Sequence, residues 1–429
     1  MRTKARQLFI VLAAVAAGLT SCRDTDVYDP DAYKDLMDQQ SPVGDIDANQ
    51  NWRMTQRHTV DVTINATGVN AQQLLILTPH QTSDAYVILA QQYVSNGQTT
   101  TANFSVPIIA DTLLYAALYD GRTYTLQPFT AGQDSVDFSR VQPELSGKSL
   151  TLLQQGYTYC FEDGMPEPGD YDYNDLVLRV VKERTAEREL KLSVTLAAIG
   201  TTMPMAAAIR LAGIQFSDIE HITASGSSNP FVGGYPQERI YLEKADTLQQ
   251  ARNGEAVIAL FEDAHWALDG RNLSVNNGIV MEHYTYNTRR IIDRNDNTSK
   301  QRTARVVTYT ITFASASVLD GLAMDDIDPF MLKDYNGGIW EVHIPAYEAA
   351  QVLWDYSLPD ASIMPWAIAV PTSAFRYPLE GISLGKYKDD VISGAYMNPD
   401  HSFGQWAANQ EVAQDWYLYP TTNPISQVY

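Results

Sequence analysis

Residues 161–177 read FEDGMPEPGDYDYNDLV, and they join two segments that have the pattern of β-strands. Before the stretch, Tyr157, Tyr159 and Phe161 alternate with Thr158 and Cys160. After it comes a run rich in valine and leucine, LVLRVVKERT at 176–185. A period of two and β-branched residues are typical of strands. The stretch therefore predicts a strand, an acidic loop and a second strand.

The same strand patterns recur along most of the chain. Five short segments separated by tight turn signals favour a β-sandwich over 49–145: 59–66, 74–79, 85–94, 101–107 and 112–121. Longer strands follow over 150–420, interrupted by polar insertions: 150–163, 176–185, 189–200, 304–315 and 341–347. The sequence predicts an all-β fold of two β-sandwich domains, the second larger and with loop insertions. A linker at 142–149 separates them, and 245–253 favours a short helix.

The N-terminus has the pattern of a targeting segment. Three cations precede the apolar residues 8–18, a run too short to span a bilayer. Leu19-Thr20-Ser21-Cys22 then resembles the lipobox of bacterial lipoproteins, which are cleaved before the cysteine and acylated on it. The resemblance implies a signal peptide at 1–21 and a lipid anchor at Cys22. An ordinary secretory signal with an incidental cysteine is the alternative.

The anchor would place the protein at the outer membrane or cell surface. Residues 22–48 are acidic and polar and predict a tether. The rest of the chain has no apolar run of eighteen residues, so we expect the membrane to be a partner through the lipid alone. Cys160 then has no second cysteine to pair with, and its strand pattern predicts a buried thiol.

The charge balance excludes some partners. The formal net charge is −21, and removing 1–21 takes away three cations and no acids, which leaves −24. Such a polyanion repels nucleic acid and anionic lipid, and it lowers the cost of recruiting Ca²⁺.

The acidic loop is the candidate metal site. Ca²⁺ takes six to eight oxygen ligands, and Asp-x-Asp-x-Asn places oxygens at alternate positions of a tight loop. The loop is not an EF-hand, because Asp175 stands where the sixth position needs glycine and Val181 where the twelfth needs glutamate. The alternative is an Asx-rich turn that caps a strand. The predicted Ca²⁺ ligands are Asp170, Asp172, Asn174 and Asp175, with Glu162 and Asp163 as helpers.

For two other acidic clusters and one histidine, the sequence predicts structural roles. Asp325, Asp326 and Asp328 form one cluster, and residues 293–297 form the other; solvated turns are expected for both. His343 shares a strand face with Glu341, but two such side chains do not make a zinc site.

Three blocks together resemble the LruC-type domain of Gram-negative surface lipoproteins, a family without assigned function. They lie at 159–181, with the FED and GDYDYND motifs, at 328–347, and between 377 and 420. The resemblance covers about 150–420. It implies a location and an architecture rather than an activity.

No catalytic residue is predicted, so we expect a calcium-binding structural or adhesion module that contacts a glycan or a surface protein. The alternative is a carbohydrate-active envelope protein, which binds or hydrolyses glycans. Three Asp-Ser/Thr-aliphatic segments also resemble an O-glycosylation sequon of some Gram-negative envelopes, with Thr112, Ser135 and Thr247 as acceptors.

The lipid anchor is directly testable. Cys22→Ala should leave the precursor uncleaved at this site or release the protein from the membrane fraction, because the acylated thiol would be lost. Fractionation and mature size on a gel measure this. A mutant of mature size that still sediments with membranes would contradict the lipobox.

Overall fold

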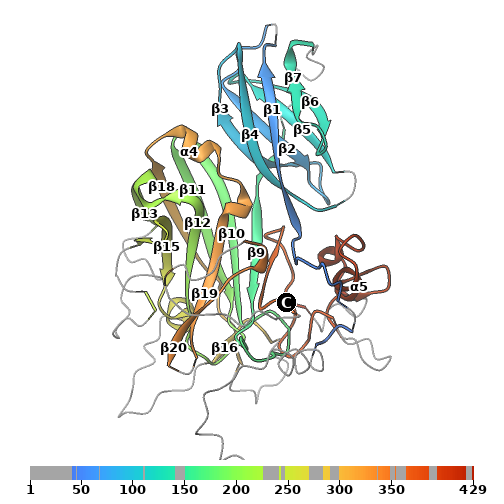
Figure 1. The fold of residues 1–429 in the computed structure, drawn as a ribbon, viewed down its shortest axis with the longest axis vertical. Helices are drawn as coiled ribbons and strands as arrows, with labels where there is room; N and C mark the ends of the chain where they lie inside the picture. The colour runs from blue at the N-terminus through green and yellow to red at the C-terminus, as the bar shows by residue number, and fades with distance from the viewer. Residues whose placement is uncertain are drawn as a thin grey trace, which may run out of the picture.

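The computed structural model describes residues 41–44, 46–66, 68–109, 112–140, 150–225, 241–242, 247–269, 284–289, 299–335, 337–347, 353, 364–385, 394–421 and 428–429. Within them the chain is mainly β-strand, which confirms the all-β prediction. Two sandwich-like units lie one above the other along the longest axis (Figure 1). No described helix is both long and apolar enough to cross a membrane.

The first unit packs a three-stranded sheet, ordered β4-β1-β7, against a five-stranded sheet, ordered β6-β5-β2-β3-β8. Alternate residues of both sheets point inward and form one apolar core, with Val62, Leu74, Phe104 and Leu118 at 0–1% exposure. Its strands are β1 Thr55–Ile64, β2 Gln73–Pro79, β3 Tyr86–Tyr93, β4 Gln98–Pro107, β5 Leu113–Tyr119, β6 Tyr124–Thr130, β7 Ser135–Asp137 and β8 Leu152–Gln154, with the 3-10 turn η1 Phe138–Arg140.

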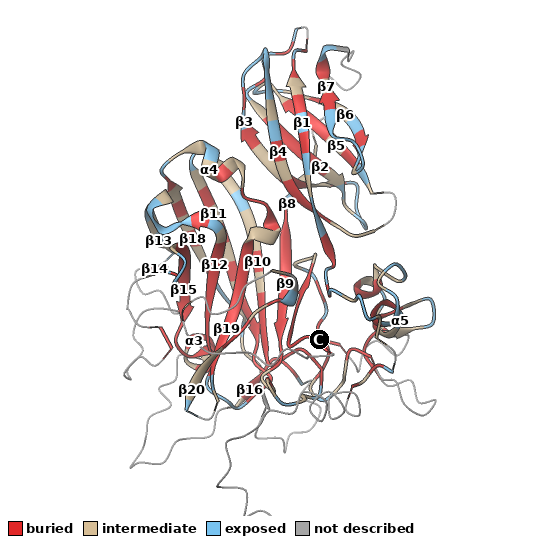
Figure 2. Ribbon diagram, in the orientation of Figure 1, coloured by how far each residue is buried: buried red, intermediate tan, exposed pale blue. Residues whose placement is uncertain are grey.

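The second unit packs a six-stranded sheet against a five-stranded one. The first has the order β13-β18-β11-β10-β9-β21, and the second β14-β15-β12-β19-β20. Strand β9, which lies between β10 and the edge strand β21, is buried along its whole length (Figure 2). The bounds are β9 Gly156–Phe161, β10 Leu176–Ala186, β11 Glu189–Ala198, β12 Ala206–Gln215, β13 Ile219–Ala224, β14 Leu248–Gln250, β15 Glu255–Phe261, β18 Arg305–Phe313, β19 Ile327–Tyr335, β20 Gly338–Val342 and β21 Ala367–Val370.

Short elements connect these strands. The predicted helix at 245–253 is wrong, because 248–250 forms β14, which pairs with β15 at the sheet edge. Pairing with a neighbouring strand overrides the weak helical preference of three residues. The connecting elements are α3 Ala264–Asp269, α4 Ala316–Asp320, α5 Phe403–Ala408, β16 Thr285–Tyr286, β17 Ser299–Lys300, β22 Met397–Asn398, β23 His401–Ser402, η2 Phe216–Asp218, η3 Met324–Asp326, η4 Pro345–Tyr347 and η5 Trp416–Leu418.

The chain passes directly from one unit to the other after β8. This strand pairs in parallel with β3 of the first unit, although position 150 is the predicted start of the second. One residue, Gln155, separates β8 from β9. The predicted linker at 142–149 lies outside the described residues.

The segment that precedes β1 packs on the second unit, although its first residues belong to the predicted tether. Val43 and Trp52 are 3% and 7% exposed and belong to the core of the second unit. Trp52 stacks on Phe403 and meets Trp406 edge-on, with ring centroids 6.1 and 5.6 Å apart. The Asp47 N–H also donates to the Ala407 carbonyl at 2.9 Å. The C-terminal aromatic cluster thus needs the N-terminal segment to cover it.

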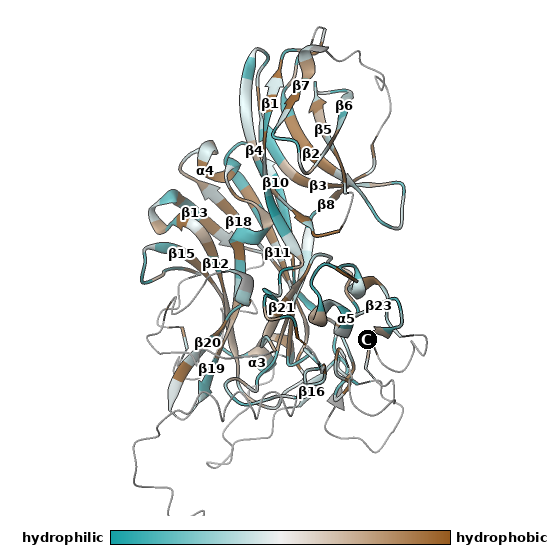
Figure 3. Ribbon diagram, turned by 45° about the vertical axis from the view of Figure 1, so that its right-hand side comes forward, coloured by the Kyte–Doolittle hydropathy of each residue, from teal (hydrophilic) through white to brown (hydrophobic). Residues whose placement is uncertain are grey.

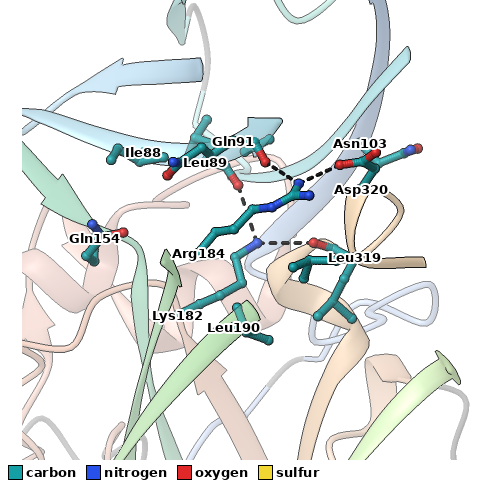
Figure 4. Close-up of a pocket in the computed structure, with 12 residues that line it drawn as sticks. Ile88, Leu89, Gln91, Asn103, Gln154, Lys182, Arg184, Leu190, Leu319 and Asp320 are labelled. Atoms are coloured by element: carbon teal, nitrogen blue, oxygen red, sulfur yellow. Dashed lines mark hydrogen bonds and ion pairs between the residues drawn. The ribbon is translucent and has the colours of Figure 1, made fainter. Parts of the chain in front are cut away.

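Two cations of β10 join the units. The C-terminal half of this strand is hydrophilic (Figure 3) and approaches β3. Lys182 Nζ donates to the Leu89 carbonyl at 3.5 Å and to the Leu322 carbonyl at 3.2 Å. Arg184 donates to the Gln91 carbonyl at 2.7 Å and binds Asp320 at 2.5 Å (Figure 4). The junction is therefore held by polar contacts from strand to strand.

We expect Trp52→Ala to destabilise the protein by about 3–5 kcal/mol, the usual cost of removing a large buried aromatic side chain. Denaturant unfolding of the mature chain would measure this. The exposed neighbour Gln56→Ala is the matched control and should stay within ~0.5 kcal/mol of wild type. Equal stability of the two variants would contradict the packing of the N-terminal segment on the second unit.

Candidate metal centre

The acidic loop, residues 162–175, connects β9 to β10. The two strands pair antiparallel from Phe161 opposite Leu176, so the loop leaves and returns at adjacent positions. The Asp163 N–H donates to Asp175 Oδ2 at 2.7 Å, which closes the base of the loop. The hairpin thus gathers its carboxylates at the end of β10 that lies away from Lys182.

Glu162 organises the interior of the loop. Its side chain is fully buried, and its two oxygens accept the N–H groups of Tyr173 at 2.5 Å and Tyr171 at 3.2 Å. Both tyrosines have left-handed backbone, with φ of 56° and 52°, a conformation that costs about 1–2 kcal/mol per residue. The converging N–H groups resemble the backbone nests that hold anions. A Cβ on Gly169 would lie 2.3 Å from Glu162 Oε2, so this position needs glycine.

The two tyrosine rings of the loop point inward. Tyr171 and Tyr173 are 1% and 0% exposed. The Tyr173 hydroxyl donates to the Pro365 carbonyl at 2.6 Å, and the Tyr171 carbonyl accepts from Leu384 N–H at 3.0 Å. With left-handed backbone at both tyrosines, their N–H groups reach Glu162 while their rings lie in the core.

Asp172 connects the loop to the C-terminal segment 364–385. It is 1% exposed, and Oδ2 accepts the Gly381 N–H at 2.6 Å while Oδ1 accepts the Asn174 N–H at 3.1 Å. The Glu162 N–H donates in turn to the Trp366 carbonyl at 2.8 Å. Sequence reasoning missed this partner segment because no sequence signal joins positions 209 residues apart.

Three carboxylates converge on one point. One oxygen each of Glu162, Asp170 and Asp172 lies within 4.8 Å of the others, with Asp170 exposed and the other two buried. Calcium–oxygen distances of about 2.3–2.6 Å put ligands on opposite sides of the ion roughly 4.6–5.2 Å apart. The three oxygens therefore fit around a single Ca²⁺, and Asp170 faces the solvent from which an ion would enter.

The other three predicted ligands have partners within the protein. Asp175 accepts the Asp163 N–H, and Asp163 Oδ2 accepts the Thr201 hydroxyl. Asn174 Nδ2 donates to the Pro378 carbonyl at 3.3 Å. A Cβ on Gly200 would lie 1.8 Å from Asn174 Oδ1, so the loop packs directly on that glycine. These side chains close the loop, and their role as ligands stays a prediction.

Burial and mutual repulsion make the cluster reluctant to ionise fully. Burial first, and then the charge of Asp170, raises the pKa of Glu162 to about 8. The pKa of Asp172 is raised well above its usual value by burial and then by Glu162. Burial also raises the pKa of Asp170 and of Glu380, which lies close enough to act on Asp172. The nearby Lys333 donates to the Asp163 and Met165 carbonyls rather than to a carboxylate.

The second acidic cluster is not a solvated turn. Asp325 accepts the Thr55 hydroxyl at 2.9 Å, and Asp326 binds Arg57. Asp328 is fully buried between Arg210 and His343, each 3.1 Å away. These acids lie inside the junction and the second unit, where cations and hydroxyls of neighbouring strands neutralise or bind them.

His343 has the structural surroundings that the sequence predicts. Burial lowers its pKa, but Asp328 and Glu341 outweigh this effect and raise it to about 9. Its ring also stacks on Phe330 at 4.5 Å. Both ring nitrogens are engaged by carboxylates, at 3.1 and 3.2 Å.

The remaining predicted residues are partly described. Cys160 is a free, buried cysteine, as predicted. Thr112 donates its hydroxyl to the Ile109 carbonyl at 2.8 Å, Ser135 is exposed on β7, and Thr247 is partly buried. Cys22 and the cluster at 293–297 lie outside the described residues.

A family model, described as a domain of unknown function (DUF4842), matches residues 188–417, which is more than half of the 429 residues. The chain belongs to the DUF4842 family. The matched range begins after the 159–181 block and includes the segment that Asp172 holds.

A crystal structure of a protein from Bacteroides ovatus, provisionally described as a lipoprotein, has 15% identity and a TM-score of 0.40, and covers 88% of this chain and 93% of that chain. No curated protein matches.

Without added divalent cation, we expect the unfolding temperature to fall as the pH rises from about 5 to about 8. Glu162 has a higher pKa in the folded protein than its ordinary value of 4.5, so the folded state binds the proton more tightly. This stabilisation is complete below the ordinary pKa and is lost as the pH passes about 8. Thermal unfolding in chelator at several pH values would measure it.

Glu162→Gln should reduce this pH dependence, because the amide does not titrate and only the other acids with a raised pKa, such as Asp172, still contribute. Glu183→Gln, an exposed acid on β10, should leave it unchanged. Identical slopes for wild type and Glu162→Gln would contradict the assignment of the effect to the buried carboxylate.

Proposed function

We propose that this DUF4842 protein is a lipid-anchored protein of the outer membrane or cell surface. In this proposal the acidic loop binds Ca²⁺ as a structural ion, and the protein is a structural or adhesion module without catalysis. The convergence of Glu162, Asp170 and Asp172 within 4.8 Å carries the calcium assignment. The lipobox ending at Cys22 supports the location.

The chemistry of the cluster favours Ca²⁺ over other ions. All three groups are carboxylates, which are hard oxygen ligands, and the described part of the loop offers no thiolate or imidazole to the cluster. Each carboxylate oxygen of Glu162 and Asp172 already accepts one backbone N–H group. A carboxylate oxygen has a second lone pair, with which it can bind a cation. An irregular shell completed by water suits Ca²⁺, whereas Mg²⁺ demands a near-ideal octahedron.

A bound Ca²⁺ would replace the repulsion among the three carboxylates with attraction to the ion. It would do so where the acidic loop meets residues 364–385. Asp172 holds Gly381, and Glu162 donates to Trp366, so the loop fastens residues 364–385 to β9 and β10. A bound cation would stabilise the ionised Asp172 carboxylate that accepts the Gly381 N–H. This loop is also the first block of the LruC-type resemblance, which stays a prediction because the matched family model begins at residue 188.

The alternative, a carbohydrate-active protein, lacks a specific observation in its favour. A cavity of about 520 Å³ lies between the two units, but the described residues that line it include no carboxylate, tryptophan, tyrosine or phenylalanine. A glycosidase needs a carboxylate pair, and glycan sites commonly use aromatic faces.

Thermal unfolding of the full mature chain tests the calcium assignment. At a Ca²⁺ concentration 100-fold above the dissociation constant, the expected stabilisation is about 2.7 kcal/mol. This corresponds to a rise in Tm of roughly 5–10 °C for a unit of this size. Mg²⁺ at the same concentration should have a much smaller effect.

Asp172→Asn should abolish most of the calcium response, because it removes one charge and keeps the shape of the side chain. Glu183→Gln is the matched control and should respond as wild type does. If Ca²⁺ does not change the Tm of the wild type, the loop is an Asx-rich turn held by hydrogen bonds and not a calcium site. A response that survives Asp172→Asn would place the ion elsewhere.

A further inference from the structure

The junction between the two units contains a cavity of about 520 Å³. Its walls come from both units: the β2–β3 turn, the end of β4 and β8 on one side, and Gly156, Val181 and residues 371–374 on the other. Ligand pockets commonly have volumes of about 300–1,000 Å³ and lie at domain interfaces. The cavity thus has the size and place of a small-molecule site.

The lining is almost without charge. None of its 19 described residues is Asp, Glu, Lys or Arg, although these types make up 19% of the chain. His80 is the one titratable side chain among them, and its Nδ1 lies 3.0 Å from the Ser83 hydroxyl. A charged ligand would lose its hydration here and gain no ion pair. The cavity therefore selects against ions.

Much of the polar lining is already hydrogen-bonded within the walls. The Thr78 hydroxyl donates to the Leu113 carbonyl at 3.3 Å, and the Thr112 hydroxyl donates to the Ile109 carbonyl at 2.8 Å. Thr372 Oγ1 accepts the Ala374 N–H at 3.1 Å. The hydroxyl groups of these threonines already form hydrogen bonds with the backbone. The walls therefore offer a ligand fewer polar contacts than their composition indicates.

The apolar lining is aliphatic and reaches the surface. It contains prolines, valines, leucines and an isoleucine, and the described lining has no aromatic ring other than the imidazole of His80. Leu113 and Leu153 are 42% and 38% exposed and are among the most exposed large hydrophobic residues described. Ser373 also lines the cavity, and its side chain has no hydrogen bond to another described residue. It offers a ligand one polar contact.

We propose that this cavity binds an uncharged, largely aliphatic small molecule that carries a hydroxyl or amide group. The lack of charge on the walls excludes ionic head groups. The aliphatic lining fits a flexible hydrocarbon body better than a sugar, which would call for aromatic faces. Ser373 would bind its polar group. This site is separate from the acidic loop and does not depend on a bound cation.

The test uses the chain produced without residues 1–21 and with Cys22→Ala, so that it needs no processing and no acyl group competes. The uncharged probe N-phenyl-1-naphthylamine should gain fluorescence on binding. 1-Decanol should displace it at concentrations at least about tenfold lower than decanoate or decylammonium, a difference of about 1.4 kcal/mol. Equal displacement by all three compounds would overturn the proposal.

Variants that fill the cavity locate the binding. Leu153→Trp and Ala374→Trp enter from opposite walls, and each should weaken probe binding at least about tenfold. Val306→Trp is the control, because Val306 is an exposed strand residue that does not line this cavity. Binding that is the same in all three variants contradicts the assignment. So does a dimer, seen by sedimentation, that Leu153→Trp dissociates, because the occupant would then be a second copy of the chain.

Discussion

The second unit depends on a carboxylate that lies inside the protein. Glu162 would be costly to bury alone, and the N–H groups of Tyr171 and Tyr173 offset part of that cost. To present both N–H groups, the loop adopts left-handed backbone at two bulky residues. That conformation sends the tyrosine rings into the core and leaves Asp170 and Asp172 beside Glu162. One buried carboxyl group thus determines both the packing of the loop and the crowding of its acidic side chains.

The hairpin of β9 and β10 carries opposite charges at its two ends. Acids gather in the loop, whereas Lys182 and Arg184 stand near the other end of β10, roughly 25 Å away at about 3.3 Å per residue. Each end fastens a different part of the chain. The acids hold residues 364–385, and the cations hold β3 of the first unit. This strand pair is the element through which the separate parts of the molecule are connected.

Strand patterns predicted the elements whose residues alternate or carry clear turn signals. β1 to β5, β10, β11 and β18 lie within a few residues of the expected segments. β12, β15 and β19 were missed, because these inner strands are buried on both faces and lack alternation. The loop residues were predicted from local spacing, and Glu162, Asp170 and Asp172 do meet. The contact between Asp172 and Gly381 was not predicted, because only the tertiary structure brings these two segments together.

The burial of Val43 and Trp52 in the second unit has a topological consequence. The second unit is discontinuous in sequence, and the first unit is an insertion between its N-terminal segment and β9. During synthesis, residues 55–154 can fold as soon as they emerge, since all their strand partners are present. The second unit must wait for Phe403, Trp406 and Trp416, about 350 residues after Trp52. The second unit is therefore completed late in folding, through contacts between residues far apart in sequence. Until the C-terminal aromatic residues have been made, Val43 and Trp52 lack the side chains on which they pack.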